Sequence, residues 1–193
     1  MAIGKANWTG GVNGGGEMFR PPASTWADPA RAGGYGWGQM SHSLAWVFRV
    51  TGLDPASAFC LSGKSAAGVD YYDAAALRMS NGATMTLSGA ATVPKHCGFQ
   101  MDARIFGTKG MILFDIERER LELHSADGEG EVFPMAPGQG AYDGKLPVVR
   151  FLEICAGGPV ANDADADNGA RVVAALAAMY RSATSGRQET VEN

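Results

Sequence analysis

The spacing of hydrophobic and polar positions changes along the chain, and each change marks an expected element. Apolar residues recur at helical spacing from Gln39 to about Thr51, where Gly52 predicts the end of a helix. Two further helices are predicted near the C-terminus, over residues 147–156 and 167–185. Short strand-like runs bounded by turn residues occupy most of the remainder. They span residues 3–12, 58–61, 73–79, 84–88, 99–106, 111–116, 121–124 and 131–135.

Tight turns between these runs predict antiparallel pairing of consecutive strands, and Asn81-Gly82 is the strongest hairpin signal. The expected fold class is therefore α+β: a predominantly antiparallel, open-faced sheet with helices on one face. With 193 residues, the chain is long enough for one substantial core and short for two, so residues 1–193 are expected to form a single domain. Residues 17–36 contain three prolines and are expected to form a long loop.

Composition narrows the set of partners. A formal net charge of −4 gives no basic surface, so neither nucleic acid nor an anionic membrane is an expected partner. No apolar run approaches the roughly 18–20 residues that cross a bilayer, and the N-terminal residues lack the layout of a secretory signal. The three cysteines, Cys60, Cys97 and Cys155, are widely spaced and predict buried thiols in a reducing compartment. A cytoplasmic location is the expectation.

Three alternating aspartates before the last predicted helix resemble the start of a calcium loop. Asn168 and Ala174 stand where that loop requires glycine and glutamate, so we predict no metal site there. The aspartates suit the N-terminus of a helix instead. They are Asp163, Asp165 and Asp167.

The candidate chemistry lies in the glycine-rich segment that leads to His42 at the start of the first predicted helix. Its glycines permit close approach of another group to the backbone, and a loop that meets a rigid helix is a common place for catalytic side chains. Imidazole, with an unperturbed pKa of about 6.5, can exchange protons near neutral pH. The alternative interpretation is a core or capping histidine. The glycines are Gly33, Gly34, Gly36 and Gly38.

Taken in order, these features resemble the C-terminal domain of the Gfo/Idh/MocA oxidoreductases, which include glucose-fructose oxidoreductase and inositol dehydrogenase. The resemblance covers essentially the whole chain. It rests on four segments: Ile3-Gly4-Lys5, Gly33 to His42, Phe106-Gly107-Thr108-Lys109-Gly110-Met111, and Asn168 to Val173 with Tyr180-Arg181-Ser182-Ala183.

The resemblance implies a catalytic role for His42 in the NAD(P)-dependent oxidation of a secondary alcohol of a sugar or polyol. It also implies self-association through the open face of the sheet. The implied substrate-binding residues are Tyr35, Trp37, Gln39 and Tyr142, with ordinary packing as the alternative for the first three.

Two departures from the family pattern are visible. Gly38 stands where family members usually carry an aspartate, four residues before His42. The family's nucleotide-binding half, its active-site lysine and any G-x-G-x-x-G motif have no counterpart in the sequence. NAD or NADP is therefore expected to bind mainly to a domain absent from this chain, which is a possible separate partner. Without that domain no activity is expected. The alternatives are a free-standing, catalytically inactive interaction module and a small-ligand binding module of the same fold.

Overall fold

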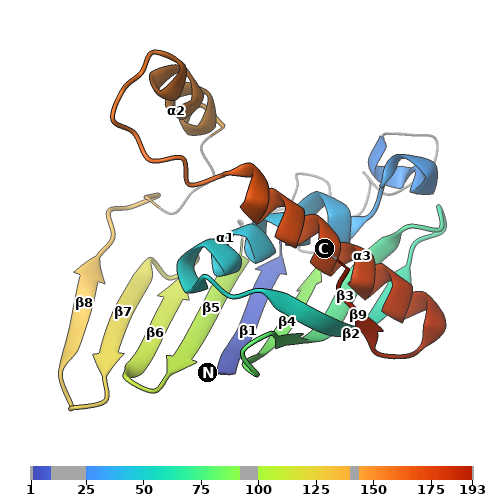
Figure 1. The fold of residues 1–193 in the computed structure, drawn as a ribbon, viewed down its shortest axis with the longest axis horizontal. Helices are drawn as coiled ribbons and strands as arrows, with labels where there is room; N and C mark the ends of the chain where they lie inside the picture. Colours follow the sequence, from blue (N-terminus) through green and yellow to red (C-terminus); the bar gives the residue numbers. More distant parts are fainter. Residues whose placement is uncertain (1, 10–24, 92–99, 140–143, 193) are drawn as a thin grey trace.

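A computed structural model describes residues 2–9, 25–91, 100–139 and 144–192 (Figure 1). In this part of the chain nine strands form one sheet with the order β8-β7-β6-β5-β1-β4-β3-β2-β9. The strands are β1 (Ala2–Thr9), β2 (Pro55–Lys64), β3 (Asp70–Met79), β4 (Thr84–Ala90), β5 (Gln100–Gly107), β6 (Gly110–Asp115), β7 (Arg120–Ser125), β8 (Gly130–Pro134) and β9 (Glu189–Thr190).

The pairing of the strands is antiparallel except at one place. β1 lies between β4 and β5, and it runs parallel to β4 and antiparallel to β5. Apart from the β2–β9 pair, the remaining neighbours form the predicted meanders, including the β3–β4 hairpin, in which Gly82 has a φ of 85°. The predicted α+β class with a predominantly antiparallel sheet is confirmed, whereas the insertion of β1 and the short strand β9 were not predicted.

Two helices, α1 (Ser41–Thr51) and α3 (Ala166–Ser185), pack on one face of the sheet, as Figure 1 shows. We call this the helix side. Gly52 ends α1 and Gly186 ends α3, each with a left-handed backbone that a glycine adopts without strain. The expected loop over 17–36 is partly helical in its described portion, which contains two short 3-10 helices, Thr25–Ala27 and Pro29–Arg31.

The core fills the space between the two helices and the helix side of the sheet. Alternate residues of β3 are buried there, as a half-buried strand requires. Each fully buried large apolar side chain contributes about 1.5–3 kcal/mol of transfer free energy. The largest of these side chains include Leu44, Val47 and Phe48 of α1, Leu176 and Met179 of α3, and Met79, Met85 and Leu87 of the strands.

The predicted helix over 147–156 is present as α2 (Leu146–Cys155), but none of its residues is buried. The expectation of buried cysteines is correct for Cys60 and wrong for Cys155, which is exposed at the end of α2. Cys97 lies outside the described residues. The sequence predicted the helix, but it could not show that no other described element packs on it.

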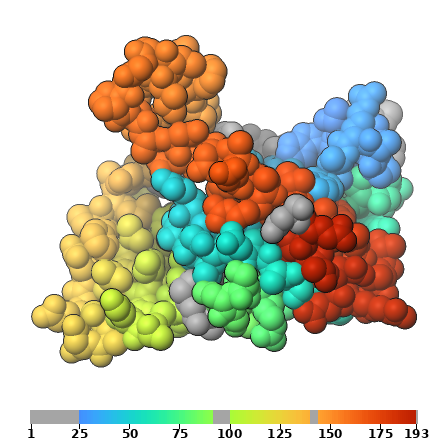
Figure 2. All heavy atoms as spheres, in the orientation of Figure 1, coloured from blue at the N-terminus to red at the C-terminus, as the bar shows by residue number. Residues whose placement is uncertain are grey.

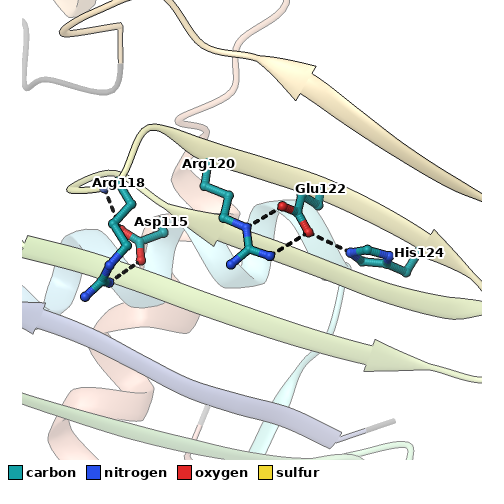
Figure 3. Close-up of polar contacts among 5 residues, drawn as sticks. All are labelled: Asp115, Arg118, Arg120, Glu122 and His124. Atoms are coloured by element: carbon teal, nitrogen blue, oxygen red, sulfur yellow. Dashed lines mark hydrogen bonds and ion pairs between the residues drawn. The ribbon is translucent and has the colours of Figure 1, made fainter.

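The opposite face of the sheet, to which Leu61, Phe106 and Glu122 belong, carries no helix; we call it the open face. Its β6–β7 region is polar (Figure 3). Glu122 accepts hydrogen bonds from Arg120 and makes a 2.7 Å contact with His124, and these two partners lower the pKa of Glu122 to about 2.

Candidate functional site

The glycine-rich segment forms a π-helical turn, Gly36–Met40, that runs directly into α1. The N–H groups at the start of a helix have no partner within the helix. Here side chains from two distant elements accept hydrogen bonds from two of these N–H groups. Asp70 Oδ2 accepts a hydrogen bond from the Gly36 N–H at 2.6 Å, and Tyr180 Oη accepts one from the Trp37 N–H at 3.1 Å.

Tyr180 and Asp70 are also bound to each other. The Tyr180 hydroxyl donates to Asp70 Oδ1 at 2.7 Å, and burial, together with the neighbouring Asp70 carboxyl, raises the pKa of Tyr180 well above its ordinary value. The Trp37 ring stacks on the Tyr180 ring with a centroid separation of 5.1 Å and an interplanar angle of 6°. Strand β3, helix α3 and the π-turn thus meet at one set of hydrogen bonds.

The glycines of this segment accommodate groups of the protein itself. Gly34 has a φ of 120°, and a Cβ at this position would lie 2.0 Å from Asp70 Oδ1. A Cβ at Gly38 would lie 1.6 Å from the Trp26 ring. The close approach expected from the glycines is therefore present, and Trp26 fills the space into which a side chain at position 38 would extend.

His42 lies in the first turn of α1, and its side chain is exposed. Partial burial nevertheless lowers the pKa of His42 below its ordinary value, because desolvation penalises the charged imidazolium. Desolvation therefore favours the neutral form of the imidazole. A neutral imidazole at a solvent-accessible position can accept a proton from a bound hydroxyl group.

The other predicted site residues are placed differently from one another. Trp37 and Gln39, on the π-turn, are half-buried, whereas Tyr35 is completely buried in the core. Tyr142 lies outside the described residues. Trp37 lines a pocket of about 170 Å³ with Ser62, Lys64, Asp70 and Tyr180, and His42 is not among the residues lining it.

Sequence reasoning missed a pair of buried carboxyl groups on β3, Asp70 and Asp73, which are only 3% and 5% exposed. Asp73 Oδ1 accepts a hydrogen bond from the Ser62 hydroxyl, while Asp73 Oδ2 is buried without a hydrogen-bond partner. Burial, and then the neighbouring Asp70 carboxyl, raise the pKa of Asp73 to about 8. Two acidic residues in a strand whose other residues are mainly apolar were the available signal.

The described residues contain no group of three potential metal ligands. Of the aspartates that resemble a calcium loop, Asp165 instead caps α3 by accepting the Asn168 N–H at 2.7 Å, and Asp163 binds Arg49 at 2.6 Å. No described helix has the length and hydropathy needed to span a membrane.

Comparison with known proteins places the chain in a family. The family model for the GFO/IDH/MocA C-terminal domain matches residues 2–113, so the chain belongs to this family of oxidoreductases. No curated protein matches the sequence. The match confirms the predicted family and the predicted fold.

Solved structures agree in fold at low sequence identity. Levoglucosan dehydrogenase in complex with NADH has a TM-score of 0.75 and 16% identity, and the match covers 100% of this chain and 59% of that one. A putative oxidoreductase from Thermotoga maritima has a TM-score of 0.73 and 18% identity, with coverage of 98% and 54%. An NAD binding oxidoreductase from Klebsiella pneumoniae has a TM-score of 0.73 and 14% identity, with coverage of 100% and 59%. The chain thus spans less than two thirds of the length of these relatives.

The contact between Gly38 and Trp26 generates a stability prediction. Gly38→Ala is expected to lower the free energy of unfolding by about 1–3 kcal/mol, because the added methyl overlaps the Trp26 ring. In a Trp26→Ala background the same substitution is expected to be neutral or stabilising. Urea unfolding of the wild type, the two single variants and the double variant measures this double-mutant cycle.

Gly169→Ala is the matched control, since Gly169 lies within α3 and a Cβ there meets nothing within 4 Å. It should stabilise the protein by about 0.4–1 kcal/mol. Equal effects of Gly38→Ala with and without Trp26 would contradict this account.

The raised pKa of Asp73 generates a prediction about pH. The folded protein keeps the Asp73 proton up to about pH 8, whereas an unfolded chain releases it near pH 4. The folded state therefore binds more protons between these values, and stability should fall as pH rises from 4 to 8. Asp73→Asn mimics the protonated carboxyl and is expected to stabilise the protein by at least about 1 kcal/mol at pH 8 and by little at pH 4.

Thermal unfolding of wild type and variant across this pH range measures the effect. Asp54→Asn, which alters an acid whose side chain is 59% exposed, is the control and should not change the pH profile. Parallel profiles for wild type and Asp73→Asn would show that Asp73 is ionised in the folded protein.

Proposed function

We propose that this chain is the substrate-binding and oligomerisation domain of an NAD(P)-dependent oxidoreductase that acts on a secondary alcohol of a sugar or polyol. Membership of the oxidoreductase family supports the reaction class. The sugar class is supported by levoglucosan dehydrogenase, which has been solved with NADH and levoglucosan and with NADH and L-sorbose. The single observation that carries the proposal is the exposed position of His42 at the start of α1, where desolvation lowers its pKa.

The described residues do not fit a dinucleotide site. Nucleotide-binding folds place a phosphate against free N–H groups at a glycine-rich helix start. In this chain the N–H groups of Gly36 and Trp37 are already bound by Asp70 and Tyr180. The nicotinamide, which would accept the hydride, is in our proposal held by another domain.

The contribution of this chain is then binding and proton transfer. His42 accepts the proton of the substrate hydroxyl group, a role that suits an imidazole with a lowered pKa. The hydrogen bonds of Asp70 and Tyr180 hold the π-turn from which α1 continues. Trp37 and Gln39 on that turn border the substrate in this proposal, and the role of Tyr142, which lies outside the described residues, rests on the sequence alone.

The contact between Trp26 and Gly38 favours a second candidate function, a catalytically inactive binding or interaction module. In the family pattern an aspartate usually stands at this position, and here the Trp26 ring occupies its space. The packing of Trp26 at this position therefore leaves no space for an aspartate side chain. The exposed His42 favours the catalytic reading, and substitution of His42 distinguishes the two.

The test joins a nucleotide-binding domain from a relative to this chain and assays oxidation of sugars and polyols. His42→Ala is expected to lower kcat/KM by roughly 10²- to 10⁴-fold, the usual effect of removing a positioned acid–base group. His42→Asn should be nearly as poor if His42 moves a proton, and should recover much of the activity if it only orients substrate. The chain without the added domain should not bind NADH appreciably in a calorimetric titration.

Unchanged kinetics in a folded His42→Ala variant would leave the inactive module as the function. Circular dichroism of both variants provides the folding control.

Self-association through the open face is the second part of the proposal. This face carries large exposed apolar side chains next to the polar β6–β7 region: Phe59, Leu61, Tyr72, Phe106 and Val132. Apolar patches of this kind on a sheet are usually covered. A second copy of the chain provides such a cover.

Light scattering at high micromolar concentration should show a dimer or tetramer. Leu61→Asp, at a side chain that is 63% exposed, is expected to shift the protein to a monomer because it places a charge in the interface. Val50→Asp, at the exposed end of α1, is the control and should leave the oligomer intact. A monomeric wild-type protein would refute self-association.

A further inference from the structure

A bulge in β3 brings two carboxyl groups to the same side of the sheet. In a regular strand, residues three positions apart lie on opposite faces. The pairing of β2 with β3 shifts between Gly63 and Lys64, which leaves Tyr71 as an extra residue on β3. An extra residue of this kind redirects the side chains next to it. Asp70 therefore joins Asp73 on the helix side of the sheet, where both side chains are buried.

The two carboxyl groups differ in their partners. Asp70 accepts two hydrogen bonds, from the Tyr180 hydroxyl at 2.7 Å and from the Gly36 N–H at 2.6 Å. Asp73 accepts one, from the Ser62 hydroxyl, and its Oδ2 atom is buried without a hydrogen-bond partner. Hydrogen-bond donors stabilise the ionised form of a carboxyl group, whereas burial favours the neutral form. The negative charge of the pair is therefore held by Asp70, and the proton by Asp73.

The groups that face Asp73 offer it no positive charge. Burial raises the pKa of the Cys60 thiol on β2 to about 12, and it raises the pKa of Tyr180 on α3 well above its ordinary value. Both groups therefore stay neutral at pH 8. The π-turn, Gly36–Met40, contains no titratable side chain. An ionised Asp73 would thus meet the negative charge of Asp70 without a cation from these elements.

The pocket of about 170 Å³ gives solvent a route to this pair. Ser62, Asp70 and Tyr180 line it, and the exposed Lys64 is also among its lining residues. None of the ion pairs within the described ranges joins Lys64 or another cation to Asp70 or Asp73. A proton can leave the pair by this route, and water from the pocket can then compete for the hydrogen bonds of Asp70.

The bond between Asp70 and the Gly36 N–H fixes the start of the helix that carries His42. The π-turn runs into α1 without a break, and His42 is the second residue of α1. In Figure 2 the segment before α1 (blue) lies on the same side of the molecule as the C-terminal part of α3 (red), from which Tyr180 binds the Trp37 N–H. A shift of the turn therefore shifts His42 relative to the sheet.

We propose that Asp73 is a positioning residue for His42: its proton keeps Asp70 bound to the π-turn, and loss of the proton releases the turn. Two carboxylates at one buried site repel each other, and Asp70 can relieve this repulsion by turning toward the water of the pocket and away from Gly36. Asp73 acts through Asp70 and touches no substrate. The effect on catalysis rests on the proposed function, whereas the effect on the turn does not.

Fluorine NMR of the chain labelled with 5-fluorotryptophan reports the position of the turn, because the Trp37 ring stacks on Tyr180 with a centroid separation of 5.1 Å. A Trp37→Phe variant assigns the signal. In the wild type this signal is expected to shift with pH, with a midpoint near pH 8. In Asp73→Asn, which keeps the uncharged state, the signal should remain where the wild type has it below the midpoint.

Ser62→Ala tests the direction of the effect. The Ser62 hydroxyl lowers the pKa of Asp73 by donating to its carboxylate, so its removal should move the midpoint up by about half to one pH unit. A merely structural role of Asp73 would not produce this displacement. Asp54→Asn, at an acid whose side chain is 59% exposed, is the matched control and should titrate as the wild type does.

The same ionisation should appear in turnover when a nucleotide-binding domain is joined to the chain. The ratio of kcat in the wild-type fusion to kcat in the Asp73→Asn fusion is expected to fall about tenfold between pH 7 and pH 9, as one ionisation with a midpoint near pH 8 requires. Ser62→Ala should move this fall to higher pH.

A Trp37 signal that does not titrate, or that titrates equally in the wild type and Asp73→Asn, would overturn the proposal. A shift that coincides with loss of the circular dichroism signal would also overturn it, because it would report global unfolding. So would an active fusion whose kcat ratio is independent of pH. A fusion that oxidises no sugar while Trp37 titrates as expected would refute the proposed function and leave the control of the turn by Asp73 standing.

Discussion

The hydrogen bonds of Asp70 hold the candidate site in place. One carboxyl group accepts the Gly36 N–H and the Tyr180 hydroxyl, and Tyr180 in turn accepts the Trp37 N–H. Each such bond contributes only about 0.5–1.5 kcal/mol net, but a buried group left without its partner costs about 1–3 kcal/mol. The π-turn therefore has one well-defined position relative to β3 and α3, and α1 with His42 continues from it.

A destabilising residue lies close to these hydrogen bonds on the same strand, β3. Asp73 is buried next to Asp70 and retains its proton up to about pH 8. Its Oδ2 atom has no hydrogen-bond partner, so Asp73 reduces the stability of the fold at neutral pH. A carboxyl group kept in the core under these conditions is a common feature near functional sites, where geometry rather than stability determines the residue.

Local signals in the sequence predicted much of the fold. Gly82 and Gly52 adopt the left-handed backbone that their turn and helix-end positions require, and the strand predicted over residues 73–79 lies within β3. Contacts between residues far apart in the sequence could not be predicted. Asp70 lies 34 residues from Gly36 and 110 from Tyr180, and no local pattern indicates such a meeting.

The candidate site shows the same division between local and distant information. His42 was placed on its helix correctly, because apolar periodicity fixes the helix. The burial of Tyr35 was not predicted, since an aromatic residue after glycines fits either a pocket wall or a core. The exposure of α2 was missed for the opposite reason: its apolar face was visible in the sequence, but the sequence could not show that no other described element packs on that face.

The position of β1 has a consequence for how the protein is made. This strand is synthesised well before its neighbours: it pairs with β4 and β5, whose residues follow about 80 and 100 positions later, with Ala2 beside Thr84 on one side and Phe106 on the other. At ribosomal rates, roughly 5–20 s pass before its second neighbour exists. Until then the β2–β4 meander can form, but its edge strand β4 lacks a partner. The nascent chain therefore exposes a sheet edge for longer than a simple meander would, and its first eight-residue strand must remain available throughout.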